Sequence, residues 1–115
     1  MKQETREALS AGRELFNQGL HFEAHEVWEV AWRAEEGEPR VLLQALILVA
    51  AGCHKARLDE PRGAVKLLGS AAAKLEALPE LAAFRRAVLE ALEGAQRWEA
   101  GGPRLVPGLL LDHRF

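Results

Sequence analysis

Residues 41–53 read VLLQALILVAAGC, a stretch that is apolar on every side when it is drawn as a helix. A helix without a polar face has to be surrounded by other helices, so we expect this one to be the central element of the fold. Gln44 interrupts the run, which is also too short to span a bilayer. The stretch therefore predicts a helical domain built around one buried helix.

The sequence on either side of this stretch predicts four more helices. Pro39, Pro61 and Pro79 each suit the first position of a helix, and Asp59 with Glu60 could cap the helix that starts at Pro61. Apolar residues recur at three- and four-residue intervals in the flanking segments. The expected helices cover about residues 2–18, 22–35, 39–58, 61–78 and 79–100, with Gly19 in a left-handed turn after the first and an irregular tail from about residue 101 whose residues 109–111 could dock.

The expected fold class is all-α, because no stretch alternates polar and apolar residues with the period of a strand. Short turns make successive helices antiparallel neighbours in one domain, residues 1–115. Ala24 and Ala64 occupy matching places in two similar helical hairpins, as in tetratricopeptide repeats. Two hairpins are too few for a solenoid, so we expect a compact helical array.

Composition excludes several classes of partner. The chain has 15 basic and 17 acidic residues, a net charge of -2 and no basic stripe, so neither nucleic acid nor a membrane surface is expected. Cys53 is the single cysteine and can form no intrachain disulfide, and the charged N-terminus does not look like a signal peptide. We expect a cytoplasmic protein.

The segment FNQGLHFEAHEVWEVAWR, residues 16–33, holds the strongest candidate site. On a helical wheel, His25 lies at the border between a tryptophan-rich stripe and an acidic strip that contains Glu26 and Glu29. His25 and Glu29 could hold a divalent metal ion with His54 from the central helix, or Glu29 could orient His25 as a general base beside Glu26. The motif is incomplete, since HEVWE lacks the second histidine of the zinc-protease pattern HExxH.

The favoured interpretation of these polar side chains is that they stabilise the fold and do not form a functional site. Glu29 can pair with Arg33 one turn further along, and His25 can bond to a carboxylate or to Gln44. Such a polar cluster would fix how two hairpins dock. A third reading is a binding surface for an unidentified partner.

The remaining polar candidates have simpler explanations. His21, four residues before His25, is expected to be solvated in a turn. His54 would cap the end of the central helix, and Asn17 would bond the backbone of the turn at Gly19. His113 lies in the tail and has no expected role.

The chain resembles the family known as domain of unknown function 309, small helical proteins of bacteria and archaea, at Phe16 with Asn17, residues 22–33, residues 44–47 and Gly63 with Ala64. The signature of that family is an FN pair, an aromatic, a segment like FEAHEVLEELWR, a Gln-Ala-Leu-Ile-like helix start and a later Gly-Ala. His21 departs from the aromatic expected at its position. The resemblance covers about residues 15–75 and implies a helical fold without an assigned reaction; the positions that it marks as candidates for a binding site are Glu23, His25, Glu26, Glu29, Trp32, Arg33 and Gln44.

Two hypotheses about function follow. The favoured one is a non-catalytic module that binds a protein, a peptide or a second copy of itself through a groove between hairpins, without a cofactor. The alternative is a metal-dependent or acid-base enzyme that acts on a small molecule at His25, Glu26 and Glu29.

Overall fold

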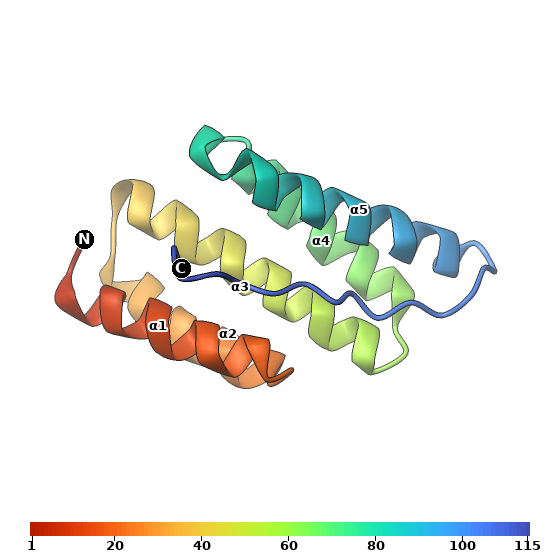
Figure 1. Ribbon diagram of the computed structural model, residues 1–115, viewed down its shortest axis with the longest axis horizontal. Helices are drawn as coiled ribbons and strands as arrows, with labels where there is room; N and C mark the ends of the chain where they lie inside the picture. The colour runs from red at the N-terminus through yellow and green to blue at the C-terminus, as the bar shows by residue number, and fades with distance from the viewer.

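Five α-helices follow one another along the chain in the computed structural model, which describes residues 1–115 (Figure 1). No strand is present, so the prediction of an all-α fold is confirmed. The elements are α1 (Gln3–Asn17), α2 (His21–Ala34), α3 (Gly37–Arg57), α4 (Pro61–Leu75), a 3-10 turn at Pro79–Leu81 and α5 (Ala82–Glu99).

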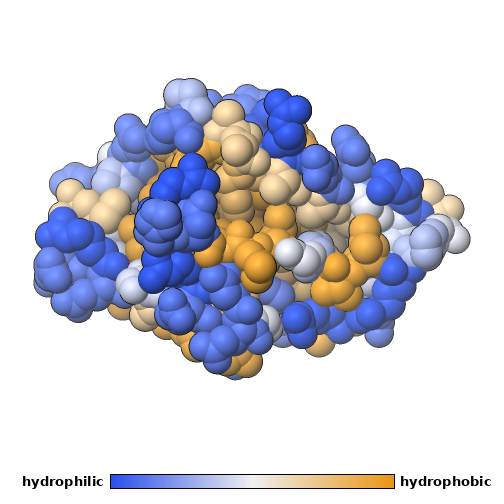
Figure 2. All heavy atoms as spheres, in the orientation of Figure 1, coloured by the Kyte–Doolittle hydropathy of each residue, from blue (hydrophilic) through white to orange (hydrophobic).

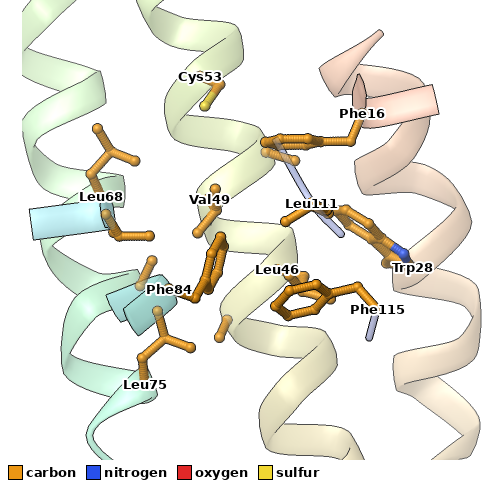
Figure 3. Packing of buried hydrophobic residues seen from close by; sticks show 14 of the residues in the cluster. Phe16, Trp28, Leu46, Val49, Cys53, Leu68, Leu75, Phe84, Leu111 and Phe115 are labelled. Atoms are coloured by element: carbon orange, nitrogen blue, oxygen red, sulfur yellow. The ribbon is translucent and has the colours of Figure 1, made fainter. Parts of the chain in front are cut away.

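Helix α3 is the central element, as its apolar sequence predicts. It packs against α2 on one side and α4 on the other, while α1 covers α2 and α5 covers α4. Leu43 of α3 is fully buried in the core, as are Leu46, Val49 and Cys53, which Figure 3 labels. The apolar stripe predicted for the fourth helix is buried in the same core; it consists of Ala64, Leu68, Ala71, Leu75 and Leu78.

The turns confirm one prediction from the local sequence and contradict two others. Gly19 has the predicted left-handed backbone, with φ +83°. The prediction that Pro39 opens α3 is wrong by two residues, since α3 starts at Gly37; proline is tolerated throughout a first turn, whose N–H groups have no helical acceptor. The predicted caps are also wrong, because no side chain caps α4. Asp59 instead ends α3 in a left-handed conformation, φ +59°, and pairs with Arg104.

A carboxylate from the turn between α2 and α3 caps α1. The buried Glu35 accepts hydrogen bonds from the backbone N–H of Lys2 (2.9 Å) and from the hydroxyl of Thr5 (2.7 Å). These bonds hold its pKa below the usual range, the Lys2 amide being the larger cause. Glu35 therefore ties the start of α1 to the end of α2.

After α5 the chain reverses and forms neither helix nor strand. Residues 103–115 run back along α3, between α1 and α5, which do not pack on each other directly (Figure 1). We call this segment the tail, and we call the space over α3 between α1 and α5, in which it lies, the central groove. None of the helices combines the length and the hydropathy that crossing a bilayer requires.

Candidate functional site

The polar face of α2 carries a short row of three polar side chains at four-residue spacing, His25, Glu29 and Arg33. His25 Nε2 lies 3.4 Å from one carboxylate oxygen of Glu29, and the other oxygen accepts a bond from Arg33 Nη2 at 3.1 Å. The imidazole is 26% exposed, and its Nδ1 is buried without a hydrogen-bond partner. The pair of Glu29 with Arg33, one helical turn apart and partly exposed, contributes about 0.3–0.5 kcal/mol. The row fits the structural interpretation of this face and leaves one nitrogen of His25 free.

Phe22 brings the third predicted ligand into the neighbourhood without completing a metal site. Its ring stacks on His25 at 5.8 Å and contacts His54 of α3 at 5.4 Å, so both imidazoles meet the phenyl ring. No group of three or more His, Cys, Asp or Glu side chains is close enough to hold a metal ion. The structure thus joins His25 to Glu29 and leaves His54 on the phenyl ring.

The other positions marked by the family resemblance are dispersed. Glu23 and Glu26 are exposed and have no hydrogen-bond or ion-pair partner. Trp32 is half-buried, and the guanidinium of Arg40 lies 4.1 Å from the centre of its ring. Gln44 is half-buried and makes no hydrogen bond to His25. These side chains do not converge on one point.

The prediction that His21 is solvated is wrong. Only 5% of the residue is exposed, and its ring meets that of Phe16 edge-on, with the ring centres 4.7 Å apart. The reason is that the turn is short, so His21 is already the first residue of α2 and folds inward. It therefore makes an aromatic contact at a position where the family signature has an aromatic. Burial, assisted by the charges of Arg57 and His54, lowers the pKa of His21 to about 4.

The prediction that Asn17 bonds the backbone of the adjacent turn is also wrong. Its side-chain amide bonds the backbone of Leu111 instead. Asn17 Nδ2 donates to the carbonyl of Leu111, and Asn17 Oδ1 accepts from the N–H of Leu111, both at 2.8 Å. The two residues are 94 positions apart, so no local pattern could show the contact. The only sequence signal was the place of Asn17 in the FN pair of the family signature.

We call the Asn17 side-chain amide, with its two hydrogen bonds to the backbone of Leu111, the clamp. Two apolar side chains anchor the tail next to it. Leu111 is 4% exposed and Phe115 is 5% exposed, and the ring of Phe115 lies 5.0 Å from that of Phe84 in α5. Figure 3 shows Leu111 and Phe115 pointing into the core. Earlier in the tail, Leu105 lies on α5 where Gly94 has no side chain; a Cβ there would be 2.3 Å from Leu105 Cδ2. The central groove thus holds the tail by the backbone of Leu111 and by two side chains, between which the chain turns and the N–H of Phe115 donates to the carbonyl of Asp112.

The tail does not fill the groove. A hollow lined by apolar residues opens between the charged outer surfaces of the helices on this face (Figure 2). One cavity of about 280 Å³ lies between Phe84, Ala87 and the tail, and a second of about 440 Å³ adjoins Phe115 on the side of α3 and the α4–α5 turn. Space for further contacts therefore remains next to the bound tail.

Comparison with known proteins identifies the family but no activity. No curated protein sequence matches the chain. The family model described as Domain of unknown function (DUF309) matches residues 9–67, more than half of the 115-residue chain. The match includes Asn17, all of α2 and all of α3, and it confirms the resemblance inferred from the FN and FEAHEV segments. The chain is a member of the DUF309 family.

Proposed function

We propose that the protein is a non-catalytic interaction module whose central groove binds an extended, apolar peptide segment. Its own tail is the resident occupant of that groove. The observation that carries the proposal is the two-way hydrogen bonding between the Asn17 amide and the backbone of Leu111.

A side-chain amide that bonds a backbone N–H and a backbone C=O recognises extended chain, whatever its side chains are. Extended backbone needs such partners because it cannot satisfy its own polar groups as a helix does. Specificity then comes from two apolar pockets, those that bury Leu111 and Phe115. The groove therefore combines general affinity for extended backbone with a preference for apolar anchors.

The tail has no helix or strand of its own, and its burial between Arg104 and Leu111 is only partial. Leu105 is 46% exposed and Leu110 is 69% exposed, while Leu109 packs half-buried against the core. Segments with few buried contacts and exposed backbone open at low free-energy cost. A partner with the same anchors could take the place of the tail.

Anisotropy of a fluorescein-labelled peptide, RLVPGLLLDHRF (residues 104–115), tests the proposal on the full-length chain. The host is a double variant, Leu111→Ala with Phe115→Ala, whose tail lacks both apolar anchors and therefore competes less for the groove. It should bind the peptide more tightly than the wild type, where the attached tail competes at an effective concentration of about 1 mM. Failure of the folded double variant to bind the peptide at millimolar concentration would refute the proposal.

Matched controls separate the clamp and the anchors from general stickiness. Asn17→Ala in the double variant should weaken binding about tenfold, because two hydrogen bonds of about 0.5–1.5 kcal/mol each are lost. Gln18→Ala, an exposed neighbour without side-chain bonds, should not. A peptide with Leu110→Ala should bind as well as the parent peptide, whereas one with Leu111→Ala should not.

The enzyme alternative at His25, Glu26 and Glu29 has less support. The geometry offers one oriented pair, His25 with Glu29, and the free Nδ1 of His25. The two cavities beside the tail contain none of these three residues. We also place the protein in the cytoplasm, a proposal supported by its single, unpaired and buried cysteine.

A further inference from the structure

The cavity of about 440 Å³ next to Phe115 has two kinds of lining. Its apolar part includes Leu42 of α3 and Leu78 and Leu81 of the α4–α5 turn. Two carboxylates also line it, Glu38 from the first turn of α3 and Glu80 from the 3-10 turn. An apolar hollow with charged groups of one sign suits a long side chain that has an aliphatic stem and an opposite charge at its end.

The charges around the cavity leave it with a negative excess. Glu38 and Glu80 are exposed and take part in no ion pair or hydrogen bond. Arg114 also lines the cavity, but its guanidinium is held by Asp112, with Nε–Oδ1 and Nη2–Oδ2 both at 2.9 Å. The only other lining residue that can carry a positive charge is Met1, through its α-amino group. The helix dipole stabilises a carboxylate at the start of a helix, whichever way the side chain points. The dipole therefore does not explain why Glu38 and Glu80 line the same cavity.

The path of the tail leads into this cavity. The tail runs along α3 towards its N-terminal end and reaches the core at Phe115, whose ring forms one wall of the cavity (Figure 1). A segment bound in the same register would place the residues that follow its aromatic anchor against Leu42, Glu38 and Glu80.

We infer that the partner of the central groove is a protein segment with lysine or arginine directly after its aromatic anchor. This inference rests on the proposed function and adds the chemistry of the partner. The aliphatic stem of the basic residue covers the leucines, and its charge pairs with Glu38 or Glu80. Such a contact adds to the affinity that the two apolar anchors supply.

Three labelled peptides test the inference, each residues 104–115 followed by Lys-Lys, Ser-Ser or Glu-Glu. Their affinities are measured on the full-length double variant Leu111→Ala with Phe115→Ala and on the wild type. The Lys-Lys peptide should bind about three- to fivefold more tightly than the Ser-Ser peptide, and the Glu-Glu peptide more weakly. The preference should shrink as salt is added.

Charge-matched variants locate the effect. Glu38→Gln with Glu80→Gln should abolish the preference for Lys-Lys. Glu90→Gln with Glu93→Gln, which removes two exposed carboxylates of α5 away from this cavity, should preserve it. Equal binding of all three peptides, or a preference that survives Glu38→Gln with Glu80→Gln, would overturn the inference and leave the proposed function standing. Failure of every peptide to bind the double variant would remove both.

Discussion

Gly12→Ala should destabilise the protein, although alanine is the better helix former. Gly12 of α1 faces Trp28 of α2, which is fully buried. A Cβ at position 12 would lie 2.1 Å from Nε1, 2.3 Å from Cε2 and 2.7 Å from Cδ1 of the indole. All three atoms belong to one rigid ring inside a close-packed core, so no flexible side-chain end can give way.

The magnitude follows from two opposing effects. Overpacking of a core costs about 1–3 kcal/mol, and occasionally more. Alanine in place of glycine in a helix gains up to about 1 kcal/mol. With contacts this short, α1 has to move away from α2, so we expect a net loss of about 1–2 kcal/mol and a Tm lower by about 4 °C for each kcal/mol.

Gly69→Ala is the matched control, because a Cβ at position 69 of α4 meets no atom within 4 Å. It should stabilise the protein by about 0.5–1 kcal/mol. Urea denaturation followed by far-UV circular dichroism measures both variants. If Gly12→Ala proves as stable as Gly69→Ala, α1 does not pack on the indole as described. Combining Gly12→Ala with Trp28→Phe should recover part of the loss, as a double-mutant cycle would show.

Three further predictions concern buried titratable groups. Burial lowers the pKa of His21 from its ordinary 6.5 to about 4, so the unfolded state binds the proton more readily. Stability should be full above pH 6.5 and fall by up to about 3 kcal/mol as the pH drops towards 4, a loss that His21→Phe removes in denaturation measured across this range. Hydrogen bonds lower the pKa of Glu35, so its contribution is present above the unfolded value of 4.5 and is lost as the pH falls through the folded value; Glu35→Gln should lower the Tm at neutral pH and differ less from wild type in acid. Burial raises the pKa of the Cys53 thiol to about 12, so a disulfide reagent should label it in urea and leave it unlabelled in the folded chain.

Much of the helical architecture could be predicted from local pattern. VLLQALILVAAGC is apolar all round, and such a helix can only be stable at the centre of others, where α3 lies. The stripe from Ala64 to Leu75 and the pairing of Glu29 with Arg33 were predictable for a related reason, whereas Leu78 of the same predicted stripe lies beyond the end of α4. Residues three or four apart in one helix share a face, whatever the rest of the chain does.

The occupant of the central groove could not be predicted in this way. Asn17, His21 and Asp59 each had an ordinary local explanation, as turn bond, solvated ring and helix cap. Their actual partners are Leu111, Phe16 and Arg104. A polar or aromatic side chain in a turn bonds to whichever segment arrives beside it, and chain closure over 94 positions leaves no trace in a local window. Helix periodicity is a property of neighbours in the chain, whereas the clamp on the tail exists only once α1, α3 and α5 have assembled around it.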